Sequence, residues 1–102
     1  MKNVLGRVEE ASPVLEGECL KVRLRVTAES GESLEAWLPE RELAALLPRS
    51  ILAGAERQVP PELLSTIEPM LARLVTGRQV RVWRYRDRGY ASFLPWRAVR
   101  FA

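Results

Sequence analysis

The sequence contains no histidine and only one cysteine, Cys19, among its 102 residues. Without histidine the chain lacks the commonest general base of enzymes and the commonest protein ligand of metal ions. A single cysteine excludes an internal disulfide and favours a reducing, cytoplasmic location. Because nucleophile–histidine–acid triads and cysteine–histidine metal sites are excluded by count, we expect a protein that is not an enzyme and that holds no metal or cofactor.

Other specialised features are missing as well. No apolar run is long enough to span a membrane, and the N-terminal residues lack the apolar core of a signal peptide, so we expect no membrane partner. The six glycines are scattered, and none forms the GxGxxG or GxxxxGK pattern of a phosphate-binding loop. With 47% hydrophobic and 28% charged residues, the composition predicts one small globular domain over residues 1–102.

The charged and aromatic residues that are present are unevenly distributed. Residues 1–72 carry 8 basic and 12 acidic residues, whereas residues 73–102 carry 8 arginines and one acid, Asp87. The same C-terminal stretch holds six of the seven aromatic residues, and the seventh is Trp37. Guanidinium groups pair with phosphates and flat rings stack on bases, so this combination is typical of a surface for single-stranded nucleic acid. The plainer explanation of the same pattern is that aromatics pack in strands and that a GC-rich or thermophilic genome favours arginine over lysine.

The N-terminal part of the chain predicts three strands. Residues 3–11 are predicted to form the first strand, with a bulge or bend at Gly6, and residues 12–17 a loop. Strict alternation of apolar and polar residues over 18–28, and again over 33–38, predicts a hairpin with one buried and one exposed face.

The exposed face of this hairpin is predicted to carry charge and one aromatic ring. Lys21, Arg23 and Arg25 alternate along the first of its strands, and Glu35 and Trp37 lie on the second. We expect Glu35 to pair with Arg23 or Arg25 across the strands, which neutralises part of the basic row.

A second hairpin is predicted near the C-terminus. Residues 78–86 predict a fourth strand and residues 87–89 a turn, with Gly89 as the conformationally permissive residue. Residues 90–101 predict a last strand that bends at Pro95, because proline cannot donate a hydrogen bond to a neighbouring strand.

Alternation along the fourth strand places Arg81, Trp83 and Tyr85 on its exposed face. Arg84 and Arg86 fall in the phase of the buried valines, where an arginine does not belong. We therefore expect the strand to leave the barrel after its second valine and to continue as a protruding basic hairpin.

Residues 39–76, between the two hairpins, predict a helical insert. A short helix is predicted after Pro39, and a longer one ends before Gly77, a residue suited to a helix C-terminus. Because Pro69 lies inside the apolar stripe of the longer helix, we expect a kink or two abutting helices near Glu68.

The resulting order is three strands, a helical insert and two strands. This order resembles that of a small five-stranded OB-type barrel (β-β-β-α-β-β), in which the insert plugs one end. The resemblance is one of architecture, and an SH3-like barrel or a PRC-type barrel with a helical appendage fits the same order. The expected fold class is therefore mixed β with a helical insert.

Fold and composition together predict a sequence-tolerant module for single-stranded DNA or RNA, or a subunit of a nucleoprotein complex. The candidate nucleic-acid-binding residues are Lys21, Arg23, Arg25, Trp37, Arg81, Trp83, Arg84, Tyr85, Arg86, Arg88, Tyr90, Trp96 and Arg97. The alternative function is a non-enzymatic adaptor whose arginine- and tryptophan-rich strands dock on a protein partner or a larger assembly.

Overall fold

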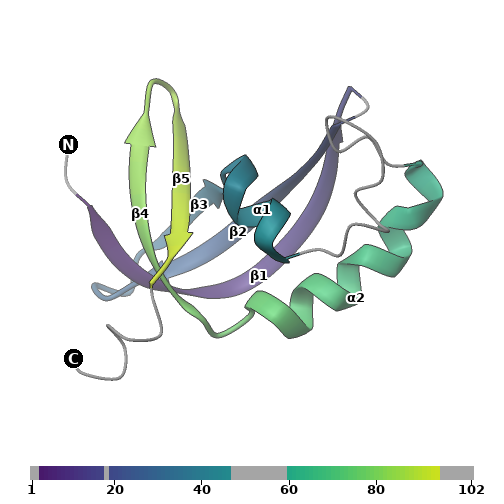
Figure 1. Ribbon diagram of the computed structural model, residues 1–102. Coiled ribbons are helices and arrows are strands. Elements are labelled where there is room, and N and C mark those ends of the chain that lie inside the picture. Colours follow the sequence, from purple (N-terminus) through teal and green to yellow (C-terminus); the bar gives the residue numbers. More distant parts are fainter. Residues whose placement is uncertain (1–2, 18, 47–59, 95–102) are drawn as a thin grey trace.

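The computed structural model describes residues 3–17, 19–46 and 60–94. The elements are β1 (Val4–Glu16), β2 (Cys19–Ala28), β3 (Ser33–Trp37), α1 (Glu40–Leu46), η2 (Pro61–Leu63), α2 (Leu64–Val75), β4 (Gln79–Tyr85) and β5 (Arg88–Phe93). The strands close into a barrel in the order β1-β2-β3-β5-β4, and the helical segments are inserted between β3 and β4 (Figure 1). The predicted mixed β-barrel of the OB-like kind is thus confirmed.

The first hairpin of the barrel is longer than predicted. The loop expected over residues 12–17 is wrong, because β1 continues to Glu16 and pairs with β2 up to Cys19. Pro13 fits in this strand because β1 pairs with β4 only over residues 4–7, so that its later part has no ladder to β4. The chain reverses at Gly17, which has a φ of +65°. The hairpin of β2 and β3 is confirmed as predicted.

Gly6 marks a close approach between strands instead of the predicted bulge. It pairs with Ala28 of β2 on one side and with Val80 of β4 on the other. A Cβ atom on Gly6 would lie 2.6 Å from Cγ1 of Val26 and 2.7 Å from the carbonyl oxygen of Thr27. The pairing of β1 with β2 does shift register, but further along β1, between Val8 and Glu10.

The insert supplies one side of the core. Ile67, Leu71 and Val75 recur every fourth residue along α2, and all three are fully buried where the helix packs on β1. Leu43 of α1 is buried in the same cluster. Larger strand residues fill the interior from the other sides: Val8, Leu20, Val22, Leu24, Val26, Val80 and Val82.

Of the kink or two abutting helices predicted near Glu68, the two abutting helices are wrong. A single α-helix runs through Pro69, and the change of helical type lies earlier, where η2 passes into α2 at Leu64. Pro69 removes the donor for the carbonyl of Ser65, but both residues lie on the exposed side of α2. Water can replace the missing hydrogen bond there, so the helix need not end.

The second hairpin extends past the barrel, as predicted. Val82 is the last residue of β4 that pairs with β1, whereas pairing with β5 continues to Tyr85. The turn lies at residues 86–87 and not at 87–89, and Arg86 adopts a φ of +59°. The predicted strand beyond Phe93, including its bend at Pro95, lies outside the described residues.

Gly89 therefore lies in a strand and not in the turn that was predicted for it. It lies in β5 opposite Arg84, and a Cβ atom there would come within 3.0 Å of the carbonyl oxygen of Glu35 on β3. The absence of a side chain allows β5 to approach β3, where the barrel closes through the parallel pairing of Trp37 with Tyr90.

Substitution of Gly6 tests the close approach of β1 to β2. Gly6→Ala forces a methyl group against Val26 and a backbone carbonyl, so the free energy of unfolding should fall by about 1–3 kcal/mol or more. Arg7→Ala at the next, exposed position should change it by less than about 0.5 kcal/mol. Urea unfolding followed by circular dichroism measures both, and equal stability of the two variants would contradict the packing described.

Candidate nucleic-acid interface

A row of aromatic side chains crosses the outside of the barrel. Trp37 on β3 pairs with Tyr90 on β5, and Tyr90 pairs with Trp83 on β4. Residues in register on adjacent strands share a face, and all three alternate with buried residues, so their rings lie side by side outside the core. The rings of Trp83 and Tyr90 are stacked, with centroids 6.0 Å apart and an interplanar angle of 27°. Each of the three side chains is half-buried.

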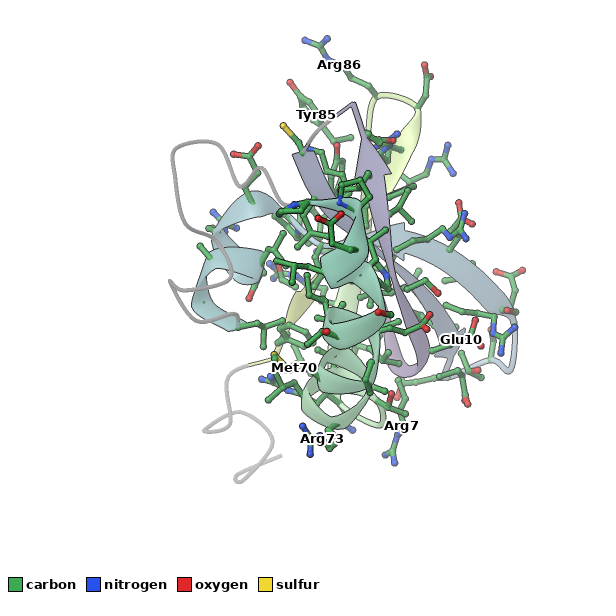
Figure 2. All side chains as sticks on the ribbon, turned by 90° about the vertical axis from the view of Figure 1, so that its right-hand side faces the viewer. Arg7, Glu10, Met70, Arg73, Tyr85 and Arg86 are labelled. Atoms are coloured by element: carbon green, nitrogen blue, oxygen red, sulfur yellow. The ribbon has the colours of Figure 1, made fainter. Side chains whose placement is uncertain are left out.

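The tip of the β4–β5 hairpin continues this face beyond the barrel. Tyr85 is 58% exposed and pairs in register with Arg88. The guanidinium of Arg86 lies 5.3 Å from the centre of the Tyr85 ring. Figure 2 shows Tyr85 and Arg86 together at one end of the molecule. Arg84 is exposed, but it alternates with Trp83 and Tyr85, so its side chain leaves the hairpin on the opposite side.

Arg88 joins two hairpin ends that are distant in sequence. Its Nη1 and Nη2 atoms donate to Oε1 and Oε2 of Glu16 at 3.3 and 3.0 Å, and its guanidinium lies 4.4 Å from the centre of the Trp37 ring. The hydrogen bond from Arg88 holds the pKa of the Glu16 carboxyl below its ordinary value. Sequence patterns gave no signal for Glu16, because the two partners are 72 residues apart and only the closed barrel brings them together.

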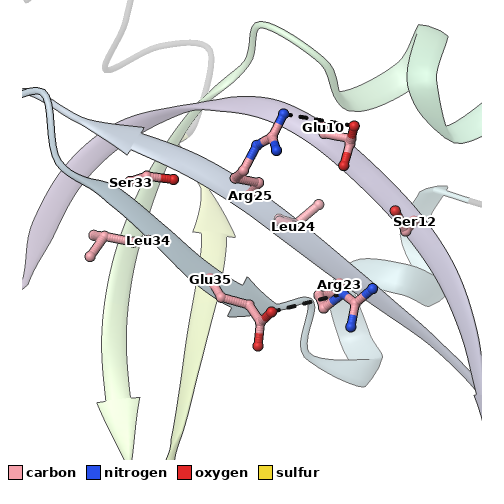
Figure 3. Close-up of a pocket in the computed structure, with 8 residues that line it drawn as sticks. All are labelled: Glu10, Ser12, Arg23, Leu24, Arg25, Ser33, Leu34 and Glu35. Atoms are coloured by element: carbon pink, nitrogen blue, oxygen red, sulfur yellow. Dashed lines mark ion pairs between the residues drawn. The ribbon is translucent and has the colours of Figure 1, made fainter.

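The basic row predicted on β2 is electrically balanced. Lys21 lies 3.9 Å from Glu40, Arg23 lies 3.9 Å from Glu35, and Arg25 lies 3.7 Å from Glu10. The predicted pairing of Glu35 with an arginine of β2 is thus confirmed. Figure 3 shows two of these ion pairs across an open pocket on the outer face of β1, β2 and β3. A row whose three cations each have a nearby carboxylate attracts phosphates weakly.

Cations that form no such ion pair lie on β4, on the neighbouring β1 and in the turn that follows β4. Arg81 is exposed on β4 and pairs in register with Leu5 of β1, while Arg7 pairs with Gln79. No carboxylate of the described ranges forms an ion pair with Arg7, Arg81 or Arg86. Figure 2 places Arg7 at the end of the molecule opposite Arg86, so these cations are spread along the length of β4. The usual rise per residue of a strand gives this stretch a length of about 20 Å.

The structure thus brings together only part of the predicted site. Trp37, Trp83 and Tyr90 form the aromatic row, and Arg81, Tyr85, Arg86 and Arg88 flank it. Lys21, Arg23 and Arg25 lie on β2 with carboxylates beside them, and Arg84 points from the opposite side of the hairpin. Trp96 and Arg97 lie outside the described residues. Arg7 was not among the predicted residues, and its pairing with Gln79 of β4 adds it to this face.

Two further observations bear on the class of site. Within the described ranges, no three histidine, cysteine or acidic side chains are grouped so as to hold a metal ion. None of the described helices is long and apolar enough to cross a membrane. The cytoplasmic location inferred from the sequence stays a prediction.

Comparison with known proteins identified no similar protein. No protein-family model matches the chain, and neither curated proteins nor solved structures gave a significant match. The fold and the surface therefore define the class by themselves: an OB-like barrel whose outer face carries an aromatic row flanked by arginines.

The lowered pKa of Glu16 predicts a stability effect with a defined sign. The folded protein holds this proton less tightly than the unfolded chain, so the Arg88 contact stabilises fully above the ordinary glutamate pKa of about 4.3. That contribution is lost as the pH falls through the lower, folded pKa. Glu16→Gln should therefore lower the urea midpoint modestly at neutral pH, and the difference from wild type should shrink as the pH falls below the ordinary glutamate pKa.

The matched control for this measurement is Glu9→Gln. Glu9 is an exposed glutamate of the same strand that forms no ion pair within the described part of the chain. A midpoint difference for Glu16→Gln that persists unchanged in acid, or one that is equally large for Glu9→Gln, would contradict the assignment to the Arg88 contact.

Proposed function

We propose that this protein is a non-enzymatic module that binds single-stranded DNA or RNA with little sequence preference, alone or within a nucleoprotein complex. The observation that carries the proposal is the row of Trp37, Tyr90 and Trp83 in register across three strands. Beside it lie Arg81 and Arg86, which form no ion pair with a carboxylate of the described residues. Aromatic rings and cations on one face are the two elements that single-strand binding requires.

Each element contributes a different part of the interaction. Flat rings stack on bases of any sequence, and a stacked base contributes about 1–3 kcal/mol. Arginines neutralise the backbone phosphates and release condensed counterions, so affinity depends steeply on salt. Arg7 pairs with Gln79 at the start of β4, Arg81 lies within β4, and Arg86 follows its end. Because these cations lie along β4, the nucleic acid is proposed to run along this strand, with its bases toward the rings.

Charge supports one part of the predicted set of binding residues over another. On β2 a phosphate would meet Glu10, Glu35 or Glu40 beside each cation, and carboxylates repel phosphates. On the β4 side, Arg7, Arg81 and Arg86 form no ion pair with a carboxylate of the described residues. The proposed interface therefore extends from Trp37 on β3 across β5 to β4 and leaves out the basic row on β2.

Salt dependence tests the role of the arginines. Wild-type protein should bind a dye-labelled oligothymidine in fluorescence anisotropy, with an affinity that falls steeply as salt rises. Arg81→Gln should reduce the slope of log affinity against log salt by about 0.7, the value for one lost phosphate contact on a single strand.

Arg25→Gln is the matched control for this variant. Arg25 is an exposed arginine on the outer face of a neighbouring strand, but it is paired with Glu10. Its replacement should leave the slope unchanged. Equal effects of the two substitutions would contradict the location of the interface, and absence of oligonucleotide binding by the wild-type protein would favour the adaptor function.

Replacement of a ring tests the stacking contribution separately. Trp83→Leu keeps an apolar side chain on the barrel but removes the flat surface, so affinity should fall about fivefold or more with little change in the salt slope. Thermal unfolding of the variant checks that the fold is intact. Unchanged affinity in a folded Trp83→Leu variant would contradict stacking at this position.

A further inference from the structure

Arg88 contacts two different groups at once. Its guanidinium carbon lies over the ring of Trp37, 4.4 Å from the ring centre, and its two Nη atoms donate hydrogen bonds to the carboxylate of Glu16. An arginine held in this way presents a flat stacking surface together with a fork of donors, which is the geometry that recognises a phosphate beside a base. In the free protein, however, a carboxylate of the same chain takes up those donors.

We infer that Glu16 occupies the phosphate position of a nucleotide subsite formed by Arg88 and Trp37, and that a backbone phosphate of bound single-stranded nucleic acid replaces it. This inference rests on the proposed function and adds to it a subsite with a built-in competitor. Carboxylate and phosphate both offer two oxygens to the arginine fork, so one can take the place of the other without rearrangement of Arg88.

The exchange leaves no buried group without a partner. The side chains of Arg88 and Glu16 are 38% and 39% exposed, so a displaced Glu16 carboxylate is hydrated at once. Glu16 is the last residue of β1 and precedes Gly17, whose positive φ marks the turn. Arg88 is held against Trp37 at the start of β5, so the donors stay in place while the acceptor changes.

Competition of this kind selects for polymers over single nucleotides. Glu16 is attached to the protein and therefore present at a high effective concentration, which a free phosphate at ordinary concentration does not match. A strand already bound along β4 brings its next phosphate to Arg88 with the same intramolecular advantage. The ligand class is thus an oligonucleotide that spans the aromatic row, and inorganic phosphate is expected to compete poorly.

The alternative role of the Arg88–Glu16 ion pair is purely structural, in that it only holds the two hairpin ends together. The two roles predict opposite effects of Glu16→Gln on the affinity for nucleic acid. If the ion pair is structural, its loss leaves this affinity unchanged or lowers it. If Glu16 competes with phosphate, its loss raises the affinity, provided that Arg88 is present.

A double-mutant cycle makes this distinction with purified, folded variants and a dye-labelled oligothymidine of about twelve nucleotides. Glu16→Gln should tighten binding about three- to tenfold, and Arg88→Gln should weaken it and lower the salt slope by about 0.7. In the Arg88→Gln background, Glu16→Gln should have almost no effect, because the contact over which phosphate and carboxylate compete is gone.

Glu10→Gln serves as the charge control, since it removes one exposed carboxylate that is also paired with an arginine. An equal gain for Glu10→Gln, or a gain for Glu16→Gln that persists without Arg88, would show general electrostatics and overturn the inference. Unchanged or weaker binding by Glu16→Gln would overturn it as well, while wild-type binding would leave the proposed function standing. No binding by either wild type or Glu16→Gln would overturn both.

Discussion

Closure of the barrel between β3 and β5 is the constraint on which the candidate site depends. Only one pair of residues is in register there, Trp37 with Tyr90, and the strands run parallel at this point. The approach is possible because Gly89 has no side chain where a Cβ would lie 3.0 Å from a carbonyl oxygen of β3. Without this contact β3 and β5 would be the two edges of one open sheet, because β1 pairs with both β2 and β4. Trp37 would then not adjoin Tyr90, and Arg88 would not reach Trp37.

Local patterns predicted the elements of this fold well, and long-range pairing explains where they did not. Alternation over β2 and β3 predicted the hairpin and the partner of Glu35, and the inward phase of Arg84 predicted a hairpin that outgrows the barrel. Residues 12–17 looked like a loop because serine, proline and glycine favour turns. The strand continues there because it has β2 beside it, which no local signal reveals.

The candidate site shows the same division between local and long-range information. Composition and alternation identified the outward rings and arginines, and the cross-strand pairing of Glu35 with β2. They gave no signal for Glu10 of β1 and Glu40 of α1, which lie beside Arg25 and Lys21 only in the assembled barrel. For this reason the proposed interface keeps the candidate residues of β4 and β5 and leaves out the row on β2. Glu16, at the distant end of β1, is added because of its contact with Arg88.

The most direct test of the central claim is a nuclear magnetic resonance titration of the isotope-labelled protein with a single-stranded oligonucleotide. The account predicts that the indole N–H signals of Trp37 and Trp83 shift, together with backbone amides of β4 and β5, while amides in the middle of β2 stay in place. Shifts confined to the outer face of β2 and its ion pairs, or no shifts at saturating oligonucleotide, would contradict it.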